Sequence, residues 1–229
     1  MKISKLKITL QEKILVDINF QILSSLALVG QSGSGKSLTL KALLGMLPSN
    51  MECELESDSD FELKAGDTLA FVPQNPFTAL SPLTKIKEQF FISLEKIESL
   101  FAQVGLDVGL LERFPPELSG GQLQRVVIAM ALESEPELIL LDEPTTALDP
   151  ETTVMILDLL KSLQSEFGFK ILFVTHDMNS AKSLCENICV IKNGKVVESG
   201  SMNEVMNNPE MDYTKTLIDA NFGNREFRI

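Results

Sequence analysis

The residues best suited to chemistry form a glycine-rich stretch at residues 30–37, which ends in Lys36 and Ser37. It fits the pattern G-x-x-x-x-G-K-[ST], in which backbone N–H groups close around phosphates. Lys36 would reach the β and γ oxygens of a nucleoside triphosphate, and the Ser37 hydroxyl would ligate Mg²⁺. A glycine-rich turn without a ligand is the simpler alternative, but the pattern arises by chance in about one such chain in a hundred. The predicted nucleotide-contacting residues are Gly30, Gln31, Ser32, Gly33, Ser34, Gly35, Lys36, Ser37 and Leu38.

Two carboxylates, Asp142 and Glu143, follow the apolar run at residues 138–141. Such a run predicts a buried strand, and α/β sheets bind ligands at the carboxyl ends of their strands. Asp142 could hold Mg²⁺ through its waters, and Glu143 could polarise an attacking water. A helix N-cap is the structural alternative. Beside a phosphate loop, the pair favours catalysis.

A second glycine-rich helix start lies at residues 118–122, Leu-Ser-Gly-Gly-Gln. Ser119 and the N–H groups of Gly120 and Gly121 would form another anion-binding helix start. A capping serine followed by flexible glycines is the alternative, but this pentapeptide arises by chance in about one of several thousand chains.

The elements that position these residues follow from hydrophobic periodicity. Strands are predicted within residues 6–20 and over residues 26–29, 68–73, 138–141, 171–174, 188–191 and 195–198. Helices are predicted over residues 36–47, through Val126 and Met130, and after Asp149, with short helices over residues 75–117. Residues 51–55 and 61–63 predict a hairpin with an acidic outer face, and Asn193-Gly194 predicts a hairpin turn. The pattern indicates a mostly parallel sheet with antiparallel edges and an inserted helical lobe.

The composition excludes several classes of protein. With 20 basic and 32 acidic residues, the chain of 229 residues carries a net charge of −12, which disfavours a nucleic-acid surface. No apolar run approaches the roughly 18 residues of a membrane span. The cysteines, Cys53, Cys185 and Cys189, match neither a disulfide framework nor a zinc spacing and are predicted to be small core residues. With no signal-like N-terminus, these features predict a cytoplasmic location.

In their order along the chain, these motifs closely resemble the ATP-binding cassette (ABC) family over essentially the whole sequence. The matching residues are the phosphate loop, Gln74, residues 118–122, the pair Asp142-Glu143, residues 147–149 and His176. The resemblance implies a P-loop ATPase core with a mixed, mostly parallel sheet. It implies one nucleotide-binding domain over residues 1–229, with a helical subdomain inserted at about residues 75–125.

The resemblance also implies roles for single residues, with ATP and Mg²⁺ as ligands. Gln74 resembles the glutamine that links Mg²⁺ and the attacking water to the membrane-facing lobe. His176 resembles the switch residue at the γ-phosphate, and Asp149 the aspartate where paired cassettes meet. Ser119, Gly120, Gly121 and Gln122 resemble the signature that completes a partner's ATP site. A second ATPase subunit, identical or homologous, is therefore implied.

Several segments resemble the importers of peptides and nickel, namely residues 73–83, 142–149, 208–209 and 213–214. The chain ends at Ile229 without the cysteine-containing extension of peptide-type members, which makes it most similar to nickel-import subunits. The expected function is ATP hydrolysis that drives uptake of nickel or nickel chelates, and a peptide importer is the alternative. Implied partners are two membrane permeases, contacted through residues 74–89, and an extracytoplasmic substrate-binding protein. The subunit would sit at the cytoplasmic face of the inner membrane.

One position departs from the family pattern, because Leu10 stands where many relatives stack an aromatic ring on adenine. Two other functions stay open. A cassette that acts on nucleic acid or ribosomes would show a duplicated cassette, a coiled-coil insertion or a basic surface. A nucleotide sensor without hydrolysis is disfavoured by Glu143.

Overall fold

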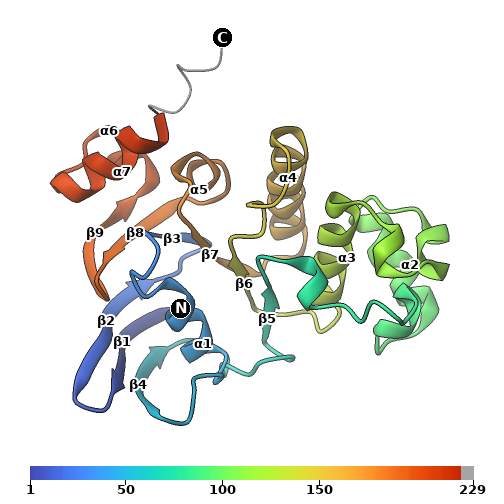
Figure 1. The fold of residues 1–229 in the computed structure, drawn as a ribbon, viewed down its shortest axis with the longest axis horizontal. Coiled ribbons are helices and arrows are strands. Elements are labelled where there is room, and N and C mark those ends of the chain that lie inside the picture. The colour runs from blue at the N-terminus through green and yellow to red at the C-terminus, as the bar shows by residue number, and fades with distance from the viewer. Residues whose placement is uncertain (223–229) are drawn as a thin grey trace. The chain divides into compact units, whose positions relative to one another are not determined.

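The computed structural model describes residues 1–222 and divides the chain into two compact units (Figure 1). Unit 1 consists of residues 1–63 and of the chain from Lys170 onward, and unit 2 is Lys64–Phe169. The phosphate loop and His176 belong to unit 1. The acidic pair and the signature residues belong to unit 2.

Unit 1 is built on seven strands in the order β4-β1-β2-β9-β8-β3-β7. Strand β3 is buried along its whole length and pairs in parallel with β7 and β8. This suits the apolar run Leu-Ala-Leu-Val, because a central parallel strand is covered on both faces. Strand β1 pairs antiparallel with β2 and β4. The strands are β1 (Lys2–Leu10), β2 (Lys13–Gln21), β3 (Ser25–Val29), β4 (Met51–Asp58), β7 (Lys170–Thr175), β8 (Asn187–Lys192) and β9 (Lys195–Ser201).

Four helices complete the described part of unit 1: α1 (Lys36–Leu43), α5 (Met178–Leu184), α6 (Met202–Asn207) and α7 (Asp212–Phe222). Helix α5 contacts β3 and β7, and α7 contacts α5 and β9 (Figure 1). The Asn193-Gly194 turn joins β8 and β9 with positive φ at both residues, as the hairpin prediction required.

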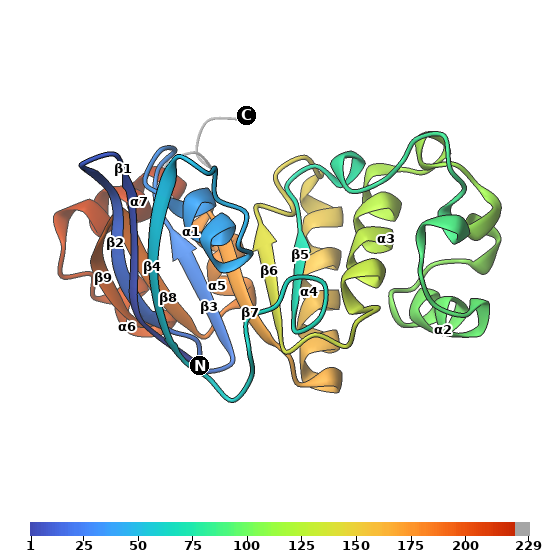
Figure 2. The same cartoon turned by 90° about the horizontal axis from the view of Figure 1, so that it is seen from below.

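Unit 2 has two parallel strands, β5 (Leu69–Val72) and β6 (Leu138–Asp142), and three α-helices. The helices are α2 (Leu94–Gln103), α3 (Gly120–Leu132) and α4 (Pro150–Phe167), and α3 lies between the other two (Figures 1 and 2). The 3-10 helices are η1 (Pro76–Thr78), η2 (Ile86–Gln89), η3 (Val108–Glu112) and η4 (Pro115–Glu117). The mixed, mostly parallel α/β fold is thus confirmed. The boundaries of the helical subdomain, about residues 75–125, stay a prediction.

The hairpin predicted from residues 51–55 and 61–63 is wrong. Strand β4 instead pairs antiparallel with β1, and residues 61–63 form no strand. Glu54 of β4 forms an ion pair with Lys5 of β1, whose Nζ lies 2.5 Å from a carboxylate oxygen of Glu54. Alternation shows that a strand has one buried face, but it does not identify the partner strand.

Two further expectations are corrected. The first helix ends at Leu43 rather than at residue 47, because Gly45 has φ +67° and its N–H turns back to the carbonyl of Ala42. Cys53 is exposed, whereas Cys185 and Cys189 are core residues as predicted. Burial raises the pKa of the Cys189 thiol to about 12, which leaves it protonated and unreactive at neutral pH.

No helix among residues 1–222 is both long and apolar enough to span a membrane.

Candidate nucleotide-binding site

The phosphate loop joins the end of β3 to the start of α1, as the motif predicts. Gly35 stands at the N-cap of α1 with φ +110°, a conformation that a residue with a side chain adopts only under strain. No side chain caps this helix start. Its first N–H groups and the positive end of its dipole are therefore suited to binding an anion.

Lys36 is held within its own loop. It is 7% exposed, and its ammonium donates hydrogen bonds to the carbonyl oxygens of Gly30 at 2.6 Å and Gln31 at 3.2 Å. The hydroxyl of Ser34 is buried without a hydrogen-bond partner in the described part of the chain. A buried cation and a buried, unsatisfied hydroxyl are groups that suit contact with phosphate oxygens.

His176 follows β7, the strand beside β3. Val29 pairs with Thr175 in the parallel register, so the phosphate loop and His176 begin at the same edge of the sheet. The imidazole residue is exposed. The structure thus brings together these two predicted parts of the site, at the edge where α/β sheets bind ligands.

In unit 2, Gln74 and the acidic pair Asp142-Glu143 lie at the carboxyl ends of two neighbouring parallel strands. Val72 of β5 pairs with Leu141 of β6 in parallel, so Gln74, just beyond β5, and Asp142, the last residue of β6, lie at neighbouring strand ends. Glu143 has φ +47°, which is strained for a residue with a side chain, and its carboxylate accepts a hydrogen bond from the Thr146 hydroxyl at 3.1 Å. Strain of this kind is concentrated at functional sites.

The signature residues form a capping box at the start of α3. The Ser119 hydroxyl accepts from the N–H of Gln122 at 3.3 Å, and the Gln122 side chain accepts from the N–H of Ser119 at 2.9 Å. Gly121 is needed for close packing, because a Cβ there would lie 2.7 Å from the Thr152 methyl carbon of α4. Ser119 thus does cap the helix, as the structural alternative predicted. The capping bonds do not involve the N–H groups of Gly120 and Gly121, which lie at the helix start.

Asp149 and the signature line one hollow of about 270 Å³ in unit 2. Asp149 caps α4, accepting from the Thr152 hydroxyl at 2.6 Å and the Thr152 N–H at 2.9 Å. These bonds, with the hydroxyl contributing most, lower the pKa of Asp149. The two features that the sequence analysis expected at a contact between paired cassettes thus lie side by side.

The residues predicted to bind Mg²⁺ offer three different kinds of oxygen donor. Among residues 1–222 no group of three or more His, Cys, Asp or Glu side chains could hold a metal. Ser37, Asp142 and Gln74 offer hydroxyl, carboxylate and amide oxygens, the hard donors that Mg²⁺ prefers when substrate phosphates supply further ligands. Ser37 belongs to unit 1, and Gln74 and Asp142 belong to unit 2. Each offers a donor that suits Mg²⁺, and their joint coordination of the ion with a nucleotide stays a prediction.

Leu10, the candidate adenine contact, lies half-buried at the end of β1, where it pairs with Lys13 and Met51. Its role stays a prediction.

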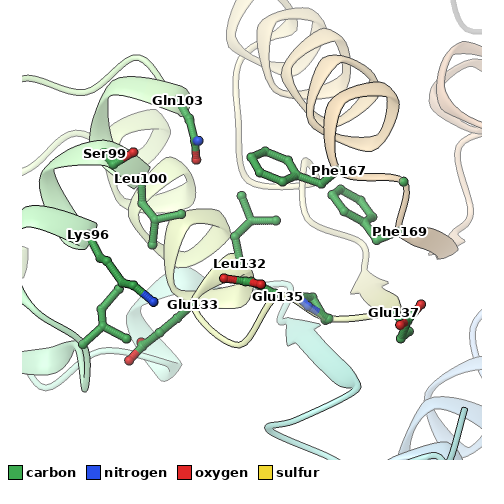
Figure 3. A pocket seen from close by; sticks show the side chains of 13 residues that line it. Lys96, Ser99, Leu100, Gln103, Leu132, Glu133, Glu135, Glu137, Phe167 and Phe169 are labelled. Atoms are coloured by element: carbon green, nitrogen blue, oxygen red, sulfur yellow. The ribbon is translucent and has the colours of Figure 1, made fainter.

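Sequence reasoning missed a cavity of about 530 Å³ in unit 2. Phe167 and Phe169 lie on one side of it and Leu100 of α2 on the other, with Leu132 between them (Figure 3). Four charged residues also line it: Lys96, Glu133, Glu135 and Glu137. The lining comes from separate stretches of chain that share no motif, so no local signal could reveal it.

Known proteins are similar to this chain over most of its length. A family model described as "ABC transporter" matches residues 15–146. The chain is 36% identical over 221 residues to the peptidoglycan transport ATP-binding protein YejF of Agrobacterium fabrum, covering 85% of this chain and 40% of that protein. It is 35% identical to the oligopeptide transport ATP-binding protein AmiE of Streptococcus pneumoniae, covering 85% of this chain and 62% of that protein. The chain thus spans about two fifths to three fifths of the length of these relatives.

One relative is covered more fully. The dipeptide transport ATP-binding protein DppF of Haemophilus influenzae is 34% identical over 232 residues, covering 92% of this chain and 71% of that protein. These relatives are named for peptide and peptidoglycan transport, so they favour the peptide alternative over the nickel prediction.

Two solved structures share the fold. The structure of cbiO1 from Clostridium perfringens, described as part of the ABC transporter complex cbiONQ, gives a TM-score of 0.76 at 25% identity and covers 97% of this chain and 95% of that one. The ATP-binding cassette MJ0796, a dimer bound to ADP and Pi, gives 0.69 at 30% identity and covers 88% and 98%. The predicted membership of the ABC family is confirmed. The phosphate loop, the signature and the matches over most of the sequence together show that the chain belongs to the ABC transporter family, as an ATP-binding cassette.

Proposed function

We propose that the chain binds and hydrolyses ATP to drive an ABC importer. The observation that carries this proposal is the phosphate loop. Its buried Lys36 ammonium donates hydrogen bonds to the carbonyls of Gly30 and Gln31, and the helix α1 that follows begins without a side-chain cap. A buried cation at a helix N-terminus is a site prepared for polyphosphate.

Each residue of the site would have a distinct task. Lys36 and the N–H groups at the start of α1 bind the phosphates, and Ser37 and Asp142 hold Mg²⁺. Bound Mg²⁺ offsets negative charge on the phosphates. Glu143 accepts the proton of the attacking water, which Gln74 helps to position, and His176 contacts the γ-phosphate.

We further propose that a second cassette completes the site. Ser119 to Gln122 would bind the γ-phosphate held by the partner's loop, and Asp149 would contact the partner. This proposal is supported by the shared hollow that the signature and Asp149 line, and by the dimer of the related MJ0796.

Residues 74–89 are proposed to contact two membrane permeases at the cytoplasmic face of the inner membrane. In this segment Phe77 is 49% exposed and Leu83 is 89% exposed, whereas Leu80, also expected to be available to the permease, is buried. Just beyond the segment, Phe91 is 94% exposed. Large apolar side chains left exposed on a short stretch suit a protein partner. The related cbiO1 is itself part of a transporter complex.

Peptides are the proposed substrate class, delivered by an extracytoplasmic substrate-binding protein. The names of the relatives, which refer to oligopeptides, dipeptides and glutathione, support this choice. Nickel uptake, the expectation from the sequence, is the competing outcome of the test.

The test is reconstitution of the chain with its co-expressed permeases and binding protein in vesicles. Short peptides should stimulate phosphate release, and nickel alone should not. The Glu143→Gln variant is the matched control and should release no phosphate with either ligand. Stimulation by nickel or its chelates alone would contradict the peptide proposal, and failure of every ligand to stimulate would contradict the importer proposal.

A further inference from the structure

Helix α7 reaches both nucleotide loops of unit 1. Near its start, the Tyr213 hydroxyl accepts a hydrogen bond from the N–H of Gln31 at 3.2 Å. Near its end, the Asn221 amide donates to the carbonyl of His176 at 3.4 Å. We propose that α7 is a strut of the ATP site, in which Tyr213 positions the phosphate loop and Asn221 positions the loop that carries His176. This inference rests on the proposed nucleotide site.

The helix is fixed to unit 1 independently of these two contacts. Thr214, Leu217 and Ile218 are buried. Just before the helix, the Glu198 carboxylate of β9 accepts hydrogen bonds from the N–H groups of Glu210 at 2.8 Å and Met211 at 3.2 Å. A helix anchored by its apolar face and at its start can hold two loops at fixed positions.

Tyr213 belongs to a set of contacts that support the phosphate loop from outside. The Lys192 ammonium lies 4.5 Å from the centre of the Tyr213 ring, a cation–π contact. Two residues further along, the N–H of Gly194 donates to the carbonyl of Ser34 at 2.9 Å. The loop is therefore held at Gln31 by α7 and at Ser34 by the turn between β8 and β9.

The contact at Gln31 matters most when nucleotide binds. The Lys36 ammonium now holds the carbonyls of Gly30 and Gln31 from within the loop. A bound phosphate would compete with these carbonyls for the donors of the ammonium, whereas the Tyr213 hydroxyl holds Gln31 from outside the loop. A loop that keeps its shape loses less conformational freedom on binding, which raises affinity.

Asn221 acts at the other end of the strut. Its side-chain oxygen accepts from the N–H of Met178 at 3.3 Å, while its amide group donates to the carbonyls of His176 and, at 2.9 Å, of Leu217. It therefore clamps the backbone on both sides of Asp177. Because His176 is assigned to the γ-phosphate, Asn221 should influence turnover more than binding.

The first experiment measures ATP affinity without turnover, by equilibrium binding of a fluorescent ATP analogue. Tyr213→Phe removes one hydroxyl and keeps the ring, and it should weaken binding about threefold to tenfold, as loss of one hydrogen bond predicts. The matched control is Thr216→Val, which removes an exposed hydroxyl that bonds only within α7, to the carbonyl of Asp212. Equal affinities of the two variants would overturn the role of Tyr213.

A second readout uses intrinsic fluorescence, because Tyr213 is the only tyrosine and the chain has no tryptophan. Quenching of its emission by acrylamide should be the same with and without ATP, since the proposal keeps α7 docked during binding. A ring that becomes more accessible on ATP binding would overturn the strut.

The third experiment separates binding from turnover. Asn221→Leu should lower kcat on the order of tenfold and leave the Kd for ATP unchanged, as expected for a residue that orients a group acting on the γ-phosphate. An unchanged kcat, or a loss of affinity as large as the loss of kcat, would overturn its positioning role.

The Lys36→Ala variant distinguishes a failure of the proposed nucleotide site from a failure of the proposed role of α7. If this variant binds ATP normally, the nucleotide site itself is wrong. If it loses ATP while Tyr213→Phe binds like Thr216→Val, only the strut is wrong.

Discussion

The phosphate loop of unit 1 and the segment at residues 74–93 of unit 2 differ in almost every physical respect. The loop follows a fully buried strand and is held by backbone hydrogen bonds at Ser34 and by the Lys36 ammonium. The segment contains two short 3-10 helices, η1 and η2, between turns and irregular chain, and it leaves Leu83 and Phe91 almost fully exposed. A loop held by many hydrogen bonds suits a ligand of fixed shape, whereas neighbouring exposed apolar side chains suit the proposed contact with a protein partner.

The largest expected effect breaks the rigid loop. Lys36→Ala should weaken ATP binding by at least about a hundredfold and nearly abolish turnover as well, because the phosphate charge loses a buried cation within the loop. Isothermal titration with ATP measures the loss. The circular dichroism spectrum of the variant should match the wild type, and near-normal affinity would refute the phosphate-loop assignment.

The second effect separates chemistry from binding. Glu143→Gln should lower kcat by about a hundredfold to ten-thousandfold, since an amide cannot accept the proton of the attacking water. The Kd for ATP should remain close to that of the wild type. Phosphate release and ATP binding are measured on the same preparation, and wild-type turnover would remove Glu143 from the role of base.

The third effect addresses the exposed segment. Leu83→Asp should reduce the stimulation of phosphate release by substrate in the reconstituted transporter about tenfold, because a charge replaces an apolar contact with the permease. Basal hydrolysis by the isolated chain should not change. Leu23→Asp, at a leucine that is 57% exposed in unit 1, is the matched control. Equal losses in both variants would remove the segment from the permease contact.

The smallest expected effect concerns Leu10, the candidate contact for the adenine base. Leu10→Tyr should tighten ATP binding about twofold to tenfold if the ring stacks on adenine, which corresponds to about 0.5–1.5 kcal/mol. Inorganic tripolyphosphate, which has no base, should gain much less. An equal gain for both ligands, or no gain for ATP, would show that Leu10 does not contact the base.

The elements around the phosphate loop could be predicted from the sequence, and the reason is physical. Residues 26–29 and 171–174 are continuous apolar runs, so their strands were identified from local pattern alone. The role of His176, which follows the second run, came instead from the resemblance to the family. The Asp149-Pro150 start of α4 was equally local, because an N-cap acts on its own helix turn.

Features that depend on distant partners could not be predicted in the same way. The pairing of β4 with β1 depends on a partner some fifty residues away, for which alternation carries no signal. The contact between Tyr213 and Gln31 joins residues 182 positions apart. The strained φ of Glu143 has no signature in residue type, because the surrounding structure imposes it.

The central claim is that ATP bound at the phosphate loop of one copy is closed over by the signature of another. Size-exclusion chromatography with ATP and Mg²⁺ tests it most directly, using Glu143→Gln to prevent turnover and Glu143→Gln/Ser119→Arg to block the signature. The single variant should elute as a dimer, and the double variant should bind ATP with similar affinity but remain a monomer. A double variant that still dimerises with ATP, or that loses ATP binding as a monomer, would contradict the account.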